Sequence, residues 1–306
     1  MKRLDPLNDY MFLKMMGEKG DEEQLLSFLN AVLYRSGKGT FKTISIVSPK
    51  ISADIVNDKS SILDVRAVVE DGTRTNIEVQ LKNMYNMGKR SLFYWSREYS
   101  KGIVSGDEYE KLPNVISINI MNFRFLDIDD FHTCFHLRED NHPEYILDDS
   151  LELHFIDMTR FRRLRKKSLE DNPLHRWLSY FNRSTKNSVI KEVLEMDSAI
   201  RKADEKMTFV SQDAEALRYY RMREMGLSDM ASRISYASKE GEIRGMRKGK
   251  REGKIEGKIE GKIEAAKKML SKGMEITLIA EVTGLAAETI EEMQNDNASE
   301  QSETFF

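Results

Sequence analysis

The stretch Ile62-Leu-Asp-Val-Arg-Ala-Val-Val-Glu-Asp-Gly-Thr-Arg-Thr-Asn-Ile-Glu-Val-Gln-Leu-Lys-Asn83 decides the fold class of the N-terminal half of the chain. Two runs that are rich in β-branched or alternating residues, 62–69 and 75–82, flank Asp71-Gly72, a dipeptide typical of tight turns. The stretch is therefore predicted to be a β-hairpin. Because side chains alternate between the two faces of a strand, we expect one apolar face and one polar face.

The polar face of this hairpin carries the residues with recognisable chemistry. It holds Asp64 and Arg66 on the first strand and Asn76, Glu78, Gln80 and Lys82 on the second. Two carboxylates on adjacent strands can share a hard divalent cation, with water and phosphate oxygens as its other ligands. Such an ion activates water and stabilises the charge that grows on a scissile phosphate. An exposed hairpin face with alternating charges explains the same pattern without catalysis.

The length of the turn decides whether the two carboxylates share a face. A two-residue loop at Asp71-Gly72 puts Asp64 and Glu78 on opposite faces of the hairpin. A three-residue loop over 71–73 sets Asp64 opposite Gln80, with all the polar residues on one face. A β-bulge has the same effect as the longer loop.

The segments around the hairpin complete a mixed α/β pattern. Helical spacing of apolar residues is seen before it, and a helix, a buried strand and two further short strands are expected after it. The predicted helices lie within 1–35 and at 92–103, and the predicted strands at 42–47, 115–120, 134–137 and 151–156. The fold class is therefore α/β, with the order helix, three strands, helix, strand.

The C-terminal half is predicted to be mainly α-helical. It contains glycine at every fourth position from Gly241 to Gly261, which indicates a long extended helix or a hinge. A helix-turn-helix-like segment follows, but its second helix is acidic, which favours docking or oligomerisation over DNA binding. The expected divisions are a first domain at 1–180, a helical region at 181–240, the repeat at 241–264, the helix-turn-helix-like segment at 265–294 and a disordered tail at 295–306.

Composition excludes several classes of protein. The 306 residues include 48 basic and 51 acidic ones, so nucleic acid can be attracted only by a local basic patch. No apolar run is long enough for a transmembrane helix, and the N-terminus lacks the apolar stretch of a signal peptide. The single cysteine, Cys134, excludes a disulfide framework within the chain. We therefore expect a cytoplasmic protein with no membrane partner.

Several short motifs, taken in order, resemble the Rpn family of recombination-promoting nucleases and transposase-like proteins, within the PD-(D/E)xK nuclease superfamily. The resemblance covers nearly the whole chain and includes the glycine repeat. It is carried by Asp64, by Leu4-Asp-Pro-Leu-Asn-Asp-Tyr-Met-Phe12, Leu29-Asn-Ala-Val-Leu33, Ile77-Glu-Val-Gln80, Val115-Ile-Ser-Ile-Asn-Ile120 and Arg176-Trp-Leu178.

The resemblance implies a PD-(D/E)xK nuclease-like core and a set of site residues. Asp64 and Glu78 would be catalytic and would hold Mg²⁺ or another divalent cation, together with the backbone carbonyl of Val79. Gln80 occupies the position where the wider superfamily usually has lysine, and it can position water or phosphate only by hydrogen bonds. Asp9 matches an acidic position of the first helix and is a candidate accessory ligand.

Two groups of cations are candidates for contact with DNA phosphates. One group follows the motif strand, and the other is the densest basic cluster of the chain, although a solvated helix face explains that cluster equally well. The candidates are Lys82, Lys89, Arg90, Arg160, Arg162, Arg163, Arg165, Lys166 and Lys167. His132, Cys134 and His136 share one face of a predicted strand, but no second cluster of cysteines or histidines accompanies them, so no zinc site is predicted there.

The site residues and the resemblance together predict a metal-dependent DNA endonuclease, and the resemblance implies a role in recombination or mobile-element movement in a bacterium. Its partner is DNA, and the C-terminal helices are a candidate surface for homo-oligomers. The alternative is a catalytically decayed nuclease fold that acts as a DNA- or partner-binding protein. Gln80 favours the alternative, whereas the presence of both Asp64 and Glu78 favours the enzyme.

Overall fold

The computed structural model describes residues 3–34, 40–47 and 64–303, with side chains described as far as residue 295. The chain divides into two compact units, Met1–Ala231 and Ser232–Phe306. The first unit contains the sheet and its covering helices, and the second is helical. This division lies later in the chain than the end of the predicted first domain at residue 180.

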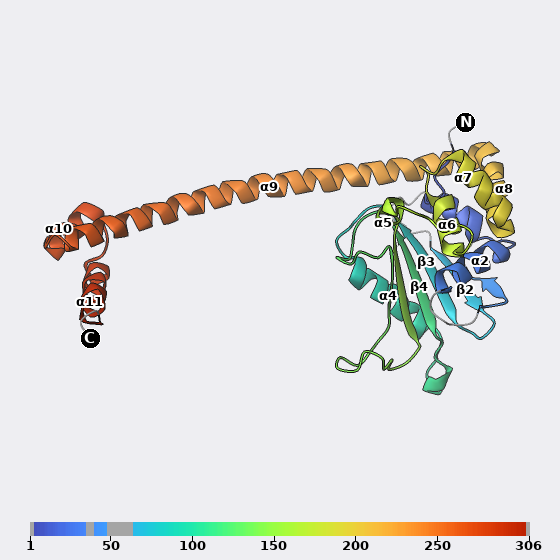
Figure 1. The fold of residues 1–306 in the computed structure, drawn as a ribbon, viewed down its shortest axis with the longest axis horizontal. Helices are drawn as coiled ribbons and strands as arrows, with labels where there is room; N and C mark the ends of the chain where they lie inside the picture. Colours follow the sequence, from blue (N-terminus) through green and yellow to red (C-terminus); the bar gives the residue numbers. More distant parts are fainter. Residues whose placement is uncertain (1–2, 35–39, 48–63, 304–306) are drawn as a thin grey trace. The chain divides into compact units, whose positions relative to one another are not determined.

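A six-stranded mixed sheet forms the centre of the first unit (Figure 1). Its strand order is β1-β2-β3-β4-β6-β5. The strands are β1 (Ile44–Ile46), β2 (Val65–Val69), β3 (Arg74–Gln80), β4 (Val115–Met121), β5 (His132–Phe135) and β6 (Leu151–Asp157). All six strands predicted from the sequence are present, with ends that differ by a few residues. Ile62 and Leu63, which we expected to belong to the second strand, lie outside the described residues.

The central strand β4 organises the sheet. It pairs in parallel with β3 on one side and with β6 on the other, and every one of its residues is buried. A continuous apolar run such as Val115-Ile-Ser-Ile-Asn-Ile120 is typical of a strand that is covered on both faces. Parallel neighbours require a crossover, which helix α4 (Met87–Ser100) supplies between β3 and β4.

The β2–β3 hairpin has a register that differs from each of our predictions. Val65 lies opposite Ile77 and Arg66 lies opposite Asn76. Continued by one residue, this register places Asp64 beside Glu78 rather than Gln80. The loop has three residues, as expected, but they are Glu70-Asp71-Gly72, because the Val69 amide donates to the Thr73 carbonyl. Gly72 has a φ of +88°, the left-handed conformation that closes a three-residue hairpin loop.

Helices cover the two faces of the sheet, with α4 on one face and α2 and α6 on the other (Figure 1). The second face is the larger core, in which Ile77, Val79 and the isoleucines of β4 pack with the helices. The covering helices there are α1 (Asp9–Met16), α2 (Glu22–Leu33) and α6 (Pro173–Phe181). Trp177 is fully buried among the rings of Phe28, Tyr180 and Phe181. The face under α4 has a smaller apolar cluster and also carries the polar residues of the hairpin.

The remaining helices belong partly to each unit. The short helices η1 (Tyr109–Lys111) and α5 (Met158–Arg163) lie in the first unit, together with α7 (Asn187–Met196) and α8 (Ser198–Gln212). Val193, Ile200 and Met207 of α7 and α8 join the same core as α1 and α2. The region 181–240, which we expected to be separate, therefore shares its core with the sheet as far as residue 220.

Helix α9 (Ala214–Leu270) runs through the whole glycine repeat without a break. The second unit also contains α10 (Ile276–Thr283) and α11 (Ala287–Glu303), which pack around Ala266, Ile279 and Ile290. Gly284 adopts φ +63° and ends α10. Helix α11 continues as far as Glu303 into the segment where we expected disorder. Among the described residues, no helix combines the length and the apolar character needed to cross a bilayer.

Trp177→Ala tests the packing of the main core. Removal of a fully buried tryptophan leaves a cavity, so we expect a loss of about 3–5 kcal/mol in the free energy of unfolding. Chemical denaturation followed by circular dichroism measures this loss. Phe209→Ala is the control, because Phe209 is 72% exposed and its removal should change stability by less than about 0.5 kcal/mol. Equal effects of the two substitutions would contradict the assigned core.

Candidate active site

Glu78 is a carboxylate in the interior of the protein. It lies on β3, between Asn119 of β4 and the continuation of β2 at Asp64, on the face that α4 covers. Its side chain is only 1% exposed. The sequence places it there because Ile77 and Val79, its neighbours on the strand, face the main core. An ionised carboxylate in such a place needs compensation from hydrogen bonds or opposite charge.

Arg90 of α4 supplies the compensating charge. Its Nε and Nη2 atoms donate to Glu78 Oε1 at 3.0 and 2.7 Å, and the Gln80 amide donates to the same oxygen at 2.5 Å. Burial raises the pKa of Glu78 above its usual value of 4.5, and attraction to Arg90 opposes this rise. The nearby negative charge of Asp64 raises the Glu78 pKa further. The second oxygen, Oε2, is buried and has no hydrogen-bond partner among the described residues.

Asp64 lies at the start of β2 and is half-buried. Its Oδ2 atom lies 3.2 Å from Nε of Arg66, the next residue on the same face. Tyr94, one helical turn from Arg90 on α4, lies beneath the Arg90 guanidinium at 5.3 Å. Burial raises the pKa of Tyr94, and both Glu78 and Asp64 contribute to this rise. Two carboxylates, an arginine and a tyrosine therefore share one environment on this face of the sheet.

This environment fits a hard divalent cation. The two carboxylates offer oxygen ligands, and the unpartnered Oε2 of Glu78 leaves one ligand atom available while Oε1 is held by Arg90 and Gln80. Val79 faces the opposite side of the sheet with its side chain in the core, so it could serve as a ligand only through its backbone carbonyl. A bound cation would also relieve the repulsion between Asp64 and Glu78.

Helix α4 is held on the hairpin by a second ionic cluster that the sequence analysis missed. Glu98 lies within 3.5 Å of Arg66 Nη1 and 3.8 Å of Arg74 Nη1, and Lys101 contacts it at 2.6 Å. Arg90, Tyr94 and Glu98 are spaced by four residues, so they follow one side of the helix. That spacing was the available signal.

Asp9, the candidate accessory ligand, lies at the start of α1. It forms an ion pair with Arg223 of α9, whose Nε lies 3.1 Å from Asp9 Oδ1. Its Oδ1 atom also accepts from the Tyr10 amide. Among the contacts that the structure describes for Asp9, none is with Asp64 or Glu78. The accessory role of Asp9 therefore stays a prediction. The contact that the structure shows is an ion pair that joins α1 to α9.

The predicted DNA-contacting cations fall into two groups. Arg160 pairs with Asp129 at 2.7 Å and with Asp157 at 3.5 Å, and Lys167 lies over the ring of Phe161. The exposed group lies on and after α5 and comprises Arg162, Arg163, Arg165 and Lys166. Arg162 donates to Asn122 Oδ1 at 2.6 Å, and the Asn122 amide donates to the Gln80 carbonyl at 3.0 Å.

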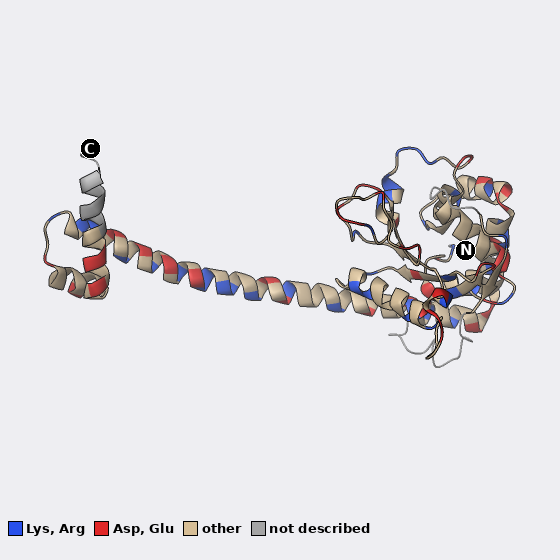
Figure 2. Cartoon of the chain, turned by 90° about the horizontal axis from the view of Figure 1, so that it is seen from below, with Lys and Arg blue, Asp and Glu red and all other residues tan. Residues whose placement is uncertain are grey.

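These contacts place α5 near the C-terminal end of β3. Lys89, on α4 beside Arg90, is also exposed, and Lys82 is half-buried just after β3. Figure 2 shows a different distribution on α9, where Lys and Arg alternate with Asp and Glu along the helix. A concentration of positive charge is therefore found near the end of β3 rather than on the glycine repeat.

Comparison with known proteins identifies the family of the chain. A model of the family described as PD-(D/E)XK nuclease family transposase matches residues 6–237, a range that includes Asp64, Glu78 and α4. A search of the curated proteins and a search of the solved structures each gave no match. The family match spans more than half of the chain and agrees with the resemblance to the Rpn family. The chain therefore belongs to the PD-(D/E)XK nuclease family transposases.

Proposed function

We propose that the protein is a metal-dependent DNA endonuclease with a PD-(D/E)xK core, and that it promotes recombination or mobile-element movement. The observation that carries the proposal is the buried Glu78 carboxylate, which has one oxygen held by Arg90 and Gln80 and the other without a partner among the described residues. Asp64 lies next to it on the neighbouring strand. The family match supports DNA as the substrate class.

Asp64, Glu78 and the Val79 carbonyl would hold Mg²⁺ or a similar hard cation. When bound, such an ion activates water and stabilises the charge on the scissile phosphate and the leaving oxygen. Arg90 keeps the Glu78 carboxylate in one orientation through two bonds to Oε1. This orientation leaves Oε2 available, so Arg90 prepares the metal site without occupying all of it.

Gln80 and Arg90 together supply the hydrogen bonds and the positive charge that a lysine at position 80 would supply. The Gln80 amide is neutral and can only donate or accept hydrogen bonds. Within the described part of the site, the positive charge in contact with Glu78 comes from Arg90. Arg90 is 19% exposed on its side chain, so it lies at the boundary between the buried carboxylate and solvent. There it is placed to attract a phosphate as well as to compensate Glu78.

DNA would reach the site at the end of the sheet where β3 terminates. Arg162, Arg163, Arg165 and Lys166 are exposed there, and Arg162 is connected to Gln80 through Asn122. Cations in this arrangement can contact successive phosphates without reading the base sequence. Arg160 has another role, because Asp129 and Asp157 already compensate its charge.

A second function, DNA or partner binding without catalysis, is favoured by the same salt bridge. Arg90 and Gln80 satisfy Glu78 Oε1 without any metal, so the fold does not need an ion to compensate this oxygen. A chain that had lost catalysis would retain this bridge and the α5 cations. The two functions differ in one requirement, because only the enzyme needs Asp64 for cleavage.

The first functional prediction concerns the two carboxylates. Asp64→Ala and Glu78→Gln should each abolish plasmid nicking in Mg²⁺, because each removes a ligand of the cation. Binding of Mg²⁺ to the folded state raises the melting temperature of the wild type, and this rise should be lost in Asp64→Ala. Glu110→Ala, which removes an exposed carboxylate of η1, is the matched control and should nick normally. Undiminished nicking by purified Asp64→Ala would refute the assigned site.

A further prediction concerns the source of positive charge. Arg90→Gln should reduce the rate of cleavage by about 100-fold or more, a loss comparable to removal of one preorganised donor from an active site. Gln80→Lys in the Arg90→Gln background should restore part of the rate, because it returns a cation to Glu78. Arg97→Gln is the control on the same helix, because Arg97 is an exposed cation that lies over the ring of Phe93, and it should cleave at the wild-type rate. Wild-type cleavage by Arg90→Gln would show that Arg90 has no such role.

The exposed cations of α5 and the segment after it are tested by replacing Arg162, Arg163, Arg165 and Lys166 together with glutamine. Affinity for a DNA duplex should fall, and the salt dependence of binding should become flatter by about 0.9 in the logarithmic slope for each lost phosphate contact. Fluorescence anisotropy at several salt concentrations measures both. The control replaces Arg247, Lys248, Lys250 and Arg251 of α9 and should change neither. An unchanged slope in the first variant would make its cations a solvated surface.

A further inference from the structure

A second cluster of ligand-type side chains lies on the other face of the sheet from Glu78. In the register of β5 and β6, Cys134 is opposite His154. Glu78, Asn119 and Phe155 are paired across β3, β4 and β6, so their side chains share one face of the sheet. The residues before and after Phe155 on β6 therefore point to the other face. His154 and Glu152 are therefore on the face of the sheet that the main core covers. Both belong to β6, next to the edge strand β5. This cluster is not part of the proposed nuclease site.

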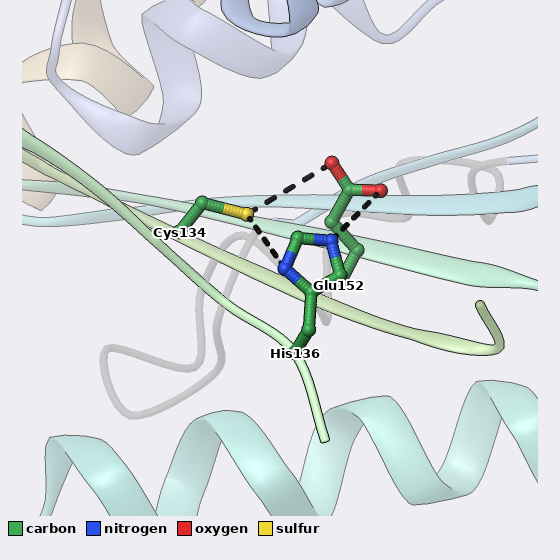
Figure 3. Close-up of side chains that lie close together, drawn as sticks. All are labelled: Cys134, His136 and Glu152. Carbon is green, nitrogen blue, oxygen red and sulfur yellow. Dashed lines mark hydrogen bonds and ion pairs between the residues drawn. The ribbon is translucent and has the colours of Figure 1, made fainter. Parts of the chain in front are cut away.

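Three side chains of the cluster point toward one another (Figure 3). The Cys134 Sγ atom lies 3.8 Å from His136 Nδ1 and 3.9 Å from Glu152 Oε1. The Nε2 atom of His136 lies 3.9 Å from Glu152 Oε2. One ligand atom from each of the three residues can be chosen so that all of them lie within 4.8 Å of one another.

The two separations from Cys134 Sγ are close to the edges of a zinc coordination sphere. With zinc–sulfur bonds of about 2.3 Å and zinc–nitrogen or zinc–oxygen bonds of about 2.0–2.1 Å, tetrahedral geometry places sulfur about 3.5 Å from each other ligand. The observed separations of 3.8 and 3.9 Å from Cys134 Sγ exceed this value by only a few tenths of an ångström. Small rotations of the side chains are therefore enough to close the site around an ion.

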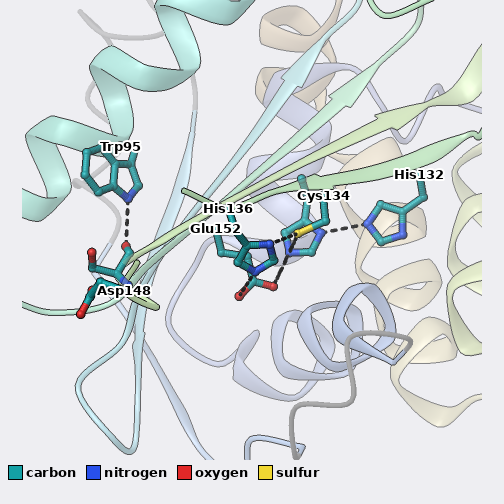
Figure 4. Close-up of polar contacts among 8 residues, drawn as sticks. Trp95, His132, Cys134, His136, Asp148 and Glu152 are labelled. Carbon is teal, nitrogen blue, oxygen red and sulfur yellow. Dashed lines mark hydrogen bonds and ion pairs between the residues drawn. The ribbon is translucent and has the colours of Figure 1, made fainter. Parts of the chain in front are cut away.

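Two histidines lie next to the cluster, and one of them, His154, contacts Glu152. Glu152 is fully buried, and its Oε1 atom lies 2.8 Å from Nε2 of His154, which is itself 1% exposed. The other ring nitrogen of His154, Nδ1, lies 2.9 Å from His132 Nε2. Figure 4 shows His132 beside Cys134. Outer partners of this kind fix the orientation of a metal-binding carboxylate. His154 Nε2 also lies 3.7 Å from Cys134 Sγ.

The cluster is accessible from a pocket. Cys134, His132 and His154 line a cavity of about 200 Å³, whose other walls include Val32 of α2 and Leu174 of α6. An ion can therefore reach the thiol side of the cluster while Glu152 remains buried. An entry path is one of the requirements of a metal site, together with ligand identity, distances and a supported outer sphere.

We propose that Cys134, His136 and Glu152 bind a zinc ion, with His154 and His132 as the outer partners that orient Glu152. A thiolate and an imidazole favour zinc over Mg²⁺, which prefers oxygen ligands in an octahedral arrangement. The ion fixes the edge strand β5, with the segment just after it, to β6, because Cys134 and His136 lie on one side of the site and Glu152 on the other. With three protein ligands, the fourth position of the tetrahedron is left for water. The site is separate from the proposed nuclease site.

The test uses the full chain after removal of metal by a chelator and measures binding of Zn²⁺ alone and Co²⁺ alone. We expect one tightly bound Zn²⁺ per chain and, with Co²⁺, a thiolate-to-metal charge-transfer absorption. Cys134→Ser should abolish this absorption and weaken Zn²⁺ binding by at least about tenfold, since loss of an outer partner alone costs that much. Bound Zn²⁺ should also raise the melting temperature of the wild type.

Two controls make the result specific. Asp64→Ala removes a ligand of the proposed nuclease site and should bind Zn²⁺ at this cluster as the wild type does. His142→Ala removes an exposed histidine from the segment between β5 and β6 and should also leave binding unchanged. The proposal is overturned if Cys134→Ser binds Zn²⁺ as tightly as the wild type, if Co²⁺ produces no thiolate absorption, or if Asp64→Ala loses the ion. The nuclease assignment is unaffected by each of these outcomes.

Discussion

The salt bridge between Arg90 and Glu78 is the interaction on which the functional half of the structure depends. A carboxylate that is 1% exposed in the middle of a sheet is costly unless an opposite charge and hydrogen bonds compensate it. Arg90 provides both, and it can do so only if α4 lies across β3 at this level. One contact thus links the position of the crossover helix to the chemistry of the site.

The same helix has a second ionic contact, through Glu98, with Arg66 and Arg74 of the hairpin. The α4 face of the hairpin is consequently held by charge pairs at two levels, whereas the opposite face is held by a continuous apolar core. This asymmetry explains how the hairpin can have a polar face that is nevertheless buried. Apolar side chains on the α4 face would also stabilise the sheet, but they would leave no carboxylate there to bind a cation.

The sheet thereby separates two kinds of chemistry. On one face, Asp64 and Glu78 provide oxygen ligands that suit a hard ion. On the other face, at the opposite end of the strand order, Cys134 and His136 meet Glu152. Alternation of side chains along β3 and β6 places Glu78 on one face and Glu152 on the other, since neighbouring residues of one strand point to opposite faces. Distinct ions at the two places would therefore not compete for ligands.

The sequence by itself determined the strands, the apolar and polar faces of the hairpin, and the nuclease family resemblance that the family match confirmed. These features are local, because periodicity and turn residues are properties of neighbouring positions. The register that puts Asp64 beside Glu78, the pairing of Arg90 with Glu78 and the approach of Glu152 to Cys134 were decided only by tertiary structure. Each joins residues from separate strands or helices, and no spacing within one segment encodes which side chains will meet across a sheet.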